Sequence, residues 1–250
     1  MKVAILGATK GMGRALAHLM AERGDRLFLL GRDGPDLERS ARDLEARAPL
    51  GGEARPTVGA ASCDLEKPET FAPALAAADT ALGGLDTVVV TAGAFATQEM
   101  LEADATLAQR VLTVDFAHTV LFCEEARRRL LARGGGTLCV FSSVAGERGR
   151  KPVVLYGAAK AGLTHYLEGL DHRFHAQGLR VVCVKPGFVH TSMTEGLPAP
   201  PFAGEPEGVA RLVLRALDRG TPVVYAPAVW CLVMAVIRCL PRFVMRKVGF

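Results

Sequence analysis

The sequence predicts an α/β fold, a three-layer Rossmann-type doubly wound parallel sheet of about seven strands. Short apolar runs alternate with helical patterns along the chain, a glycine-rich turn follows the first run, and no repeat or long linker divides the 250 residues. This alternation is typical of parallel strands joined by crossover helices in a single domain, residues 1–250. The strand-like runs are 3–6, 27–30, 57–61, 88–90, 137–141, 180–184 and 223–225.

Composition narrows the class of protein. Half of the chain is hydrophobic, 22% is charged and the net charge is +4, which favours a large core and argues against disorder. The basic residues are scattered rather than clustered with aromatics, so no nucleic-acid partner is expected. The six cysteines form no C-x-x-C pair and read as buried thiols in a reducing compartment. The N-terminus runs straight into a strand without the apolar segment of a signal peptide, so we expect a cytoplasmic protein.

The turn after the first strand is Gly7-Ala8-Thr9-Lys10-Gly11-Met12-Gly13, and an amphipathic helix follows it. Glycines let the backbone approach a phosphate, and a helix N-terminus supplies free N–H groups and a positive dipole end. The spacing differs from the G-x-G-x-x-G fingerprint. A dinucleotide-phosphate site is favoured over a tight turn that holds no ligand.

Arg32 follows the second strand, where dinucleotide folds place the adenosine ribose. An acidic residue there accepts from a 2′-hydroxyl, whereas arginine pairs with a 2′-phosphate. Lys10 adds a second cation, and Asp33 is interpreted as the start of the next helix. NADP(H) is therefore favoured over NAD(H).

Two further strand ends carry candidate cofactor contacts. Asp64 follows the third strand and is either an acceptor for the adenine amino group or a helix cap, with equal support. Ala92 and Gly93 follow the fourth, where small residues let a ribose lie against the backbone.

Tyr156 and Lys160 lie one turn apart on the same face of a predicted helix, with Ser143 shortly upstream. Tyrosine has an ordinary pKa of about 10, and an ammonium about 4 Å away favours the phenolate by roughly three pK units at an effective dielectric of about 20. Taken alone, the spacing is more often coincidence than catalysis. No metal is expected, because His165, His172 and His175 share one helix without a fourth ligand at zinc-like spacing.

Together these motifs, with Pro186-Gly187-x-Val189-x-Thr191, resemble the short-chain dehydrogenase/reductase family along nearly the whole chain. The resemblance implies the strand order 3-2-1-4-5-6-7. It implies that Ser143 holds the carbonyl oxygen, that Tyr156 is the acid/base, and that Lys160 lowers the tyrosine pKa and binds the nicotinamide ribose. The cofactor set implied is Gly7, Thr9, Lys10, Gly11, Met12, Gly13, Arg32, Asp64, Leu65, Ala92, Gly93, Tyr156, Lys160, Pro186, Gly187, Val189 and Thr191.

Two positions depart from the family pattern. Thr91 stands where the family has the asparagine of Asn-Ala-Gly, and Asp115 stands where an asparagine holds a water for the proton relay. We place Asp115 in the catalytic set and expect its carboxylate to pair with Lys160. The pKa of Tyr156 is then lowered less than is usual in the family.

Two C-terminal segments complete the prediction. Residues 188–206 are rich in Pro and Gly and suit a substrate lid. Residues 228–250 form an apolar and basic tail with Pro241 interrupting its helix. The tail either docks on an anionic bilayer or packs on the protein's own pocket or a partner subunit. It also resembles the tail of the reductase component of the decaprenylphosphoryl-ribose epimerase system, a subgroup that reduces a keto-sugar on a lipid phosphate.

The expected function is an NADP(H)-dependent carbonyl reductase or alcohol dehydrogenase acting on a bulky, lipophilic or lipid-linked ketone. A soluble ketone and a 3-oxoacyl thioester are the other substrates considered. The expected state is a homodimer or homotetramer in the cytoplasm, either free or at the inner membrane surface. The alternative from another class is a catalytically silent NADP(H)-binding sensor or scaffold.

Overall fold

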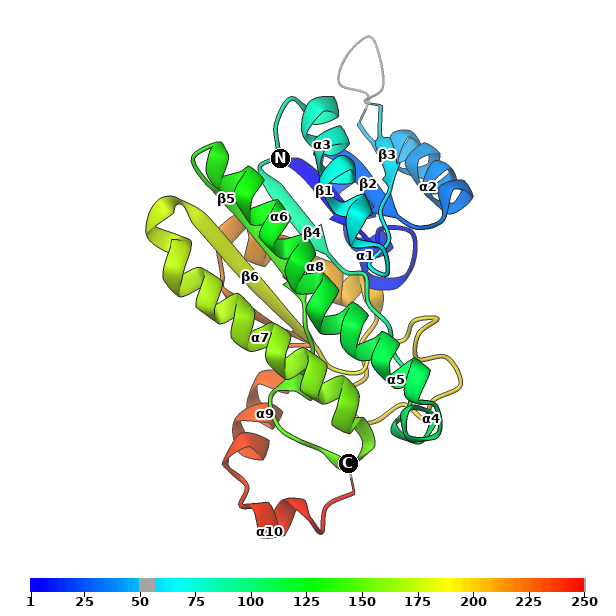
Figure 1. The fold of residues 1–250 in the computed structure, drawn as a ribbon, viewed down its shortest axis with the longest axis vertical. Coiled ribbons are helices and arrows are strands. Elements are labelled where there is room, and N and C mark those ends of the chain that lie inside the picture. The colour runs from blue at the N-terminus through cyan, green and yellow to red at the C-terminus, as the bar shows by residue number, and fades with distance from the viewer. Residues whose placement is uncertain (50–56, 250) are drawn as a thin grey trace.

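The computed structural model describes residues 1–49 and 57–249. Their core is one seven-stranded parallel sheet in the order β3-β2-β1-β4-β5-β6-β7, as predicted (Figure 1). The strands are β1 Lys2–Leu6, β2 Arg26–Gly31, β3 Gly59–Ser62, β4 Thr87–Val90, β5 Gly136–Phe141, β6 Leu179–Pro186 and β7 Val223–Ala226. Most of the predicted loop over 48–56 lies outside the described residues.

Helices cover both faces of the sheet because the central strands carry apolar side chains on both faces. In β1, Val3 and Ile5 join the core on one face of the sheet, whereas Ala4 and Leu6 join the core on the other face. A strand buried on both faces reads as a continuous apolar run. The helices are α1 Gly11–Glu22, α2 Gly34–Arg47, α3 Phe71–Leu82, α4 Gln98–Ala103, α5 Ala105–Leu112, α6 Thr119–Ala132, α7 Val154–Phe174, α8 Pro206–Arg219, α9 Trp230–Cys239 and α10 Arg242–Met245.

The helical stretch between β4 and β5 is interrupted near Asp115. A π-helical segment, Thr113–His118, joins α5 to α6. The wider turn inserts one extra residue, which hydrophobic periodicity does not register, and such segments are frequent at functional sites. Asp115 lies in this segment and is fully buried.

The C-terminal tail is two short helices rather than one. α9 ends at Cys239 and α10 begins at Arg242, so the break expected at Pro241 is confirmed. Trp230, Met234 and Ile237 are buried against Val144. No helix among the described residues is long and apolar enough to cross a bilayer.

The expectation of buried thiols holds for four of the six cysteines. Cys63, Cys123, Cys139 and Cys183 are buried in the main domain. Cys231 and Cys239 are exposed on α9, so the expectation of buried thiols was wrong for these two. They occupy an apolar run whose outer face points to solvent.

Candidate active site

The predicted site residues meet at the carboxyl edge of the sheet. Parallel strands end at one edge, so the segments after β1, β4, β5 and β6 converge there (Figure 1). These segments carry the glycine turn, Thr91 to Gly93, Ser143, and Pro186 to Thr191.

The glycine turn is held by close backbone packing. Gly7 has φ of +98°, and a Cβ on Gly13 would lie 2.2 Å from the Gly7 carbonyl oxygen. Thr91 Oγ1 donates to the Gly7 and Leu6 carbonyls at 2.9 and 3.1 Å. The threonine therefore ties the end of β4 to the turn, which gives this departure from the family pattern a structural role.

The N-terminus of α1 suits a phosphate. Lys10 precedes it in an extended conformation, no described side chain caps the helix, and its first turn holds no acidic residue. The free N–H groups and the dipole therefore favour an anion at this point. Thr191 faces the turn from the other side, with its methyl group 3.2 Å from where a Cβ on Gly11 would lie. The cradle fits the pyrophosphate of a dinucleotide.

The two expected cations at the ribose end are exposed and weakly paired. Arg32 lies 3.6 Å from Glu66, and Lys10 lies 3.6 Å from Asp36. Surface pairs at this distance are easily exchanged for a stronger anion. Asp33 Oδ1 accepts from the Asp36 N–H, so it caps α2, as the sequence suggested.

The two residues after β3 are engaged locally. Asp64 Oδ1 accepts from the Glu66 N–H at 3.0 Å in a turn, and the next helical segment begins at Pro68 with Lys67 as its N-cap, so the expectation of a helix cap was wrong. Leu65 packs in the core, and its carbonyl oxygen lies 2.6 Å from His118 Nδ1. Their contacts to the adenine stay predictions.

Ser143, Tyr156 and Lys160 come together at the ends of β5 and α7. Ser143 Oγ accepts from the Ala145 N–H at 3.1 Å, which fixes the hydroxyl as the cap of a short 3₁₀ segment. The Tyr156 ring packs edge-on against Phe95, with centroids 5.1 Å apart. Lys160 Nζ lies 5.7 Å from the Tyr156 ring centroid.

Asp115 is part of this cluster. Its Oδ1 lies 3.6 Å from Lys160 Nζ and accepts from the Ala94 N–H at 2.8 Å. Its Oδ2 is buried with no hydrogen-bond partner among the described residues. A Cβ on Gly93 would lie 2.8 Å from Oδ1, so glycine is required there. The pairing expected between Asp115 and Lys160 is confirmed.

Burial and two opposing charges set the proton affinities of the cluster. Burial raises the pKa of Tyr156 above its ordinary value, Lys160 opposes this, and Asp115 reinforces it. Burial works to lower the pKa of Lys160, but Asp115 and Tyr156 outweigh it and the pKa is raised. The prediction of a lowered tyrosine pKa does not hold in this structure, because the Coulomb estimate from spacing omitted desolvation.

A cavity of about 230 Å³ opens beside Tyr156 and Ser143. Met12, Val189 and Thr191 line it from the cofactor side, and Met193, Thr194, Leu197 and Pro200 line it from the expected lid. Most of the lining is apolar, which suits a lipophilic substrate.

Two aromatic residues of this cavity were not placed in the site from the sequence. Phe95 comes two residues after the pair Ala92-Gly93, which follows β4. Its position next to these predicted cofactor contacts is the only sequence feature that pointed to the site. Trp230 begins α9, and its indole lies 2.1 Å from where a Cβ on Gly187 would be. Its Nε1 donates to the Phe202 carbonyl at 3.2 Å, so the tail packs on the protein's own pocket.

A buried ionic network holds β7 and the tail against the segment after Ser143. Glu147 Oε1 accepts from Lys185 Nζ at 2.5 Å and from the Tyr225 hydroxyl at 2.7 Å. Arg238 of α9 lies 3.6 Å from Oε2. Arg148 adds a hydrogen bond to the Leu240 carbonyl at 2.7 Å.

Comparison with known proteins identifies the family. A family model described as short chain dehydrogenase matches residues 1–200. An uncharacterized oxidoreductase of Mycobacterium tuberculosis is 33% identical over 98% of this chain and 96% of its own length. Carbonyl reductase family member 4 of Danio rerio is 30% identical over 86% of this chain and 90% of its own.

A solved short-chain type dehydrogenase/reductase from Mycobacterium ulcerans has the same fold, with a TM-score of 0.80 at 22% identity over 89% of this chain and 86% of its own. The chain belongs to the short-chain dehydrogenase/reductase family. It is an oxidoreductase of a family that uses NAD or NADP.

Proposed function

We propose that the protein is an NADPH-dependent carbonyl reductase that acts on a lipophilic ketone. The proposal is carried by Ser143 and Tyr156, which line an apolar cavity beside the glycine turn, with the buried Lys160 Nζ 5.7 Å from the Tyr156 ring centroid. Carbonyl reduction needs a proton donor at the carbonyl oxygen, and Tyr156, which carries a hydroxyl, lines the cavity where that oxygen would lie.

When bound, NADPH supplies a hydride to the carbonyl carbon of the substrate. Ser143 Oγ–H donates to the carbonyl oxygen and fixes its position. The Tyr156 hydroxyl gives its proton to the oxygen as the alkoxide forms. Lys160, held by Asp115, stabilises the phenolate that is left, and it would hold the nicotinamide ribose of a bound cofactor.

The alternative is a dinucleotide-binding sensor without turnover, which the pairing of Asp115 with Lys160 keeps open. A panel of aliphatic, aromatic and lipid-linked ketones and 3-oxoacyl thioesters, assayed for NADPH oxidation, separates the two. Turnover of any member supports the reductase. NADPH binding without turnover across the panel supports the sensor.

The preference for NADPH is proposed from Arg32 and Lys10, whose side chains are 65% and 71% exposed. Arg32→Ala removes a charge-assisted contact to the 2′-phosphate. We expect the ratio of kcat/KM for NADPH over NADH to fall about tenfold or more. The matched control is Arg42→Ala, an equally exposed arginine on α2, which leaves the ratio unchanged. An unchanged ratio in Arg32→Ala contradicts the assignment.

The proton relay gives a pH-dependent prediction. Asp115→Asn keeps a side-chain oxygen that accepts from the Ala94 N–H. It removes a negative charge that raises the pKa of Tyr156 and of Lys160. Reduction needs the protonated tyrosine, so activity is lost as pH rises through its pKa. We therefore expect the alkaline limb of kcat/KM to move to lower pH. Asp171→Asn, on the outer side of α7, serves as the control, and an unmoved limb in Asp115→Asn shows that Asp115 is not coupled to the site.

Contact of the tail with a membrane surface is proposed from its outer face. Leu232, Val236 and Phe243 are 72, 64 and 66% exposed beside basic residues of the same helices. Sedimentation with anionic vesicles tests this, and replacing the three by serine should release the protein. Equal sedimentation of both proteins rules it out.

The expected homodimer or homotetramer stays a prediction, and sedimentation velocity of the purified protein measures the oligomeric state.

A further inference from the structure

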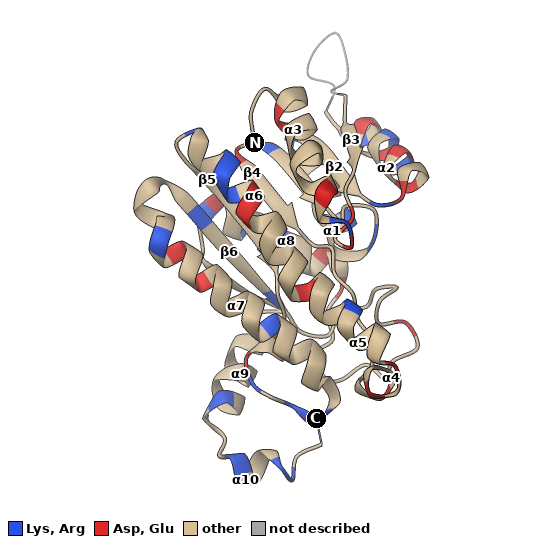
Figure 2. Cartoon of the chain, viewed as in Figure 1, with Lys and Arg blue, Asp and Glu red and all other residues tan. Residues whose placement is uncertain are grey.

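A second and larger cavity lies on the far side of the segment that follows Ser143. Its volume is about 700 Å³, and residues 145–151, the first two turns of α7, and α10 enclose it. Figure 2 shows blue bands on the loop before α7 and on α9 and α10 at this end of the molecule. The cationic residues that line the cavity are Arg148, Arg150, Lys151, Arg242 and Arg246.

These five cations have no acidic partner within the part of the chain that the structure describes. None of them lies within 4.0 Å of a carboxylate among residues 1–49 and 57–249. Arg148 donates to a backbone carbonyl, and Arg150 Nε is buried without a hydrogen-bond partner in the same part of the chain. A buried guanidinium nitrogen without an acceptor is costly, so the arrangement favours an incoming anion.

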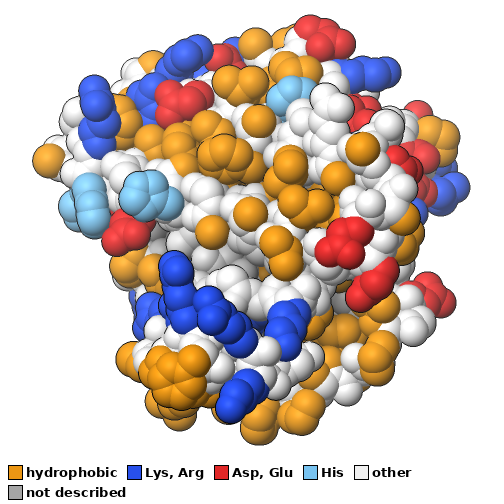
Figure 3. Space-filling model, turned by 60° about the horizontal axis from the view of Figure 1, so that its bottom comes forward, with side chains coloured by type: hydrophobic (Ala, Val, Ile, Leu, Met, Phe, Trp, Pro, Cys, Tyr) orange, Lys and Arg blue, Asp and Glu red, His pale blue; other side chains and the backbone are white. Residues whose placement is uncertain are grey.

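Glu147 is the one carboxylate that the described residues place in the lining, and it does not neutralise this charge. Glu147 has only 3% of its side chain exposed, and its oxygens are engaged by Lys185, Tyr225 and Arg238. The cavity therefore presents an excess of positive charge. Figure 3 shows Lys and Arg side chains gathered beside hydrophobic ones on this end of the surface.

The cavity adjoins the substrate cavity. Arg150 and Ala145 line both cavities. The substrate cavity alone is small for a bulky ketone. The second cavity also offers apolar walls from Val154, Ala158 and Met245.

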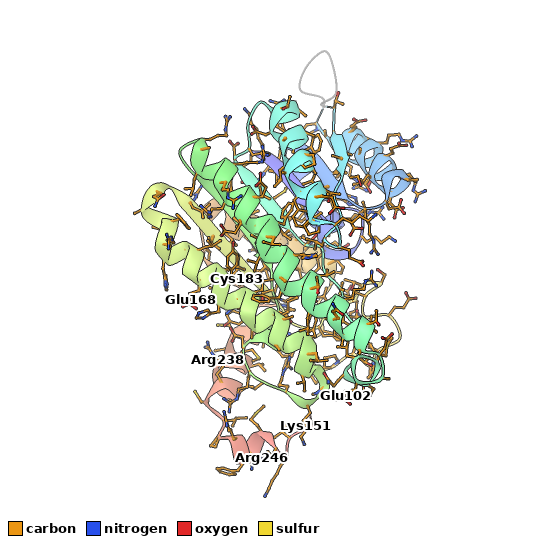
Figure 4. The ribbon with its side chains drawn as sticks, in the orientation of Figure 1. Glu102, Lys151, Glu168, Cys183, Arg238 and Arg246 are labelled. Carbon is orange, nitrogen blue, oxygen red and sulfur yellow. The ribbon has the colours of Figure 1, made fainter. Side chains whose placement is uncertain are left out.

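We infer that this basic cavity binds a phosphoryl group carried by the carbonyl substrate. The inference rests on the proposed reductase function. Guanidinium groups match the oxygens of a phosphate in a planar fork, and several of them suit a dianion better than a single carboxylate. Arg150 lies between the two cavities and orients the part of the substrate that joins the carbonyl to the phosphate. Lys151, before α7, and Arg246, directly after α10, contact the phosphate from two sides. Both residues are labelled at this end of the molecule in Figure 4.

The test uses ketones with a terminal phosphate ester and their dephosphorylated counterparts, over linkers of increasing length. For the wild type we expect kcat/KM to favour the phosphorylated member by about tenfold or more at the best linker, mainly through KM. Lys151→Gln/Arg246→Gln, at two exposed positions, should reduce this preference about tenfold. Arg211→Gln, exposed on α8 across the sheet, is the matched control and keeps it. Salt should weaken the preference.

Binding of inorganic pyrophosphate by calorimetry gives a readout that does not depend on turnover, and the double variant should bind it more weakly than the wild type. Turnover of neutral ketones with no preference for phosphate at any linker overturns this inference alone. If the double variant in that case binds pyrophosphate more weakly than the wild type, the cavity is assigned to a free phosphate. Equal pyrophosphate affinity in wild type and double variant also overturns it. Failure to turn over any ketone overturns the proposed function and, with it, the substrate assignment.

Discussion

Replacing Tyr156 by phenylalanine is expected to lower kcat for ketone reduction by about 10³-fold, in the range typical for loss of a positioned proton donor. The phenyl ring keeps the edge-on packing against Phe95, so the cavity keeps its shape. The change removes only the hydroxyl group. This hydroxyl delivers the proton, and Lys160 stabilises the phenolate that forms when the proton has left. Steady-state NADPH oxidation with a substrate from the ketone panel measures the effect.

The matched control is Tyr166→Phe on the same helix. The Tyr166 hydroxyl donates to Glu124 on α6, away from the cavity, so its loss should leave kcat within about twofold. NADPH affinity, measured by fluorescence, should stay within about threefold in Tyr156→Phe, because the turn and Arg32 are untouched. A Tyr156→Phe protein that keeps more than about a tenth of wild-type kcat shows that the proton comes from another group.

Glu147→Ala is expected to lower the free energy of unfolding by about 3–5 kcal/mol, the range for removing one partner of a buried ion pair. Glu147 is the common acceptor of Lys185 and Tyr225, and Lys185 is itself buried. Without the carboxylate, Lys185 is left as a buried cation with no acidic partner among the described residues. Urea unfolding monitored by circular dichroism gives the difference.

Two comparisons make the test specific. Glu168→Ala, at an exposed position on α7, should cost no more than about 0.5 kcal/mol. Glu147→Leu/Lys185→Met replaces both charges by apolar groups and should be less destabilised than Glu147→Ala. If Glu147→Ala and Glu168→Ala cost the same, the network does not hold the tail to the domain.

The sheet and its carboxyl edge were predictable because their signals are local. β1, β4 and β5 each contain a continuous apolar run of three or four residues. The turn after β1 needs glycines where the backbone has positive φ or no room for a Cβ. The four-residue spacing of Tyr156 and Lys160 predicts that they share one face of a helix. The other motifs, in their order along the chain, distinguish this pair from a coincidence.

Other features depend on contacts or solvation that a linear pattern does not encode. The π-helical turn at Asp115 adds one residue to a helix whose amphipathic pattern continues through it. The contact from Arg148 to Leu240 joins residues 92 positions apart, so the basic cavity emerges only when the tail folds back. The raised pKa of Tyr156 depends on burial, which spacing does not report.

The most direct measurement of the central claim is deuteride transfer from NADPH labelled at C4. The protein is incubated with labelled cofactor and the ketone panel, and the products are analysed by mass spectrometry and NMR. Carbonyl reduction at Tyr156 predicts deuterium on the carbinol carbon of the alcohol in the wild type and about 10³-fold slower labelling in Tyr156→Phe. Bound NADPH that transfers no deuterium to any ketone, or equal labelling by both proteins, would contradict the assignment.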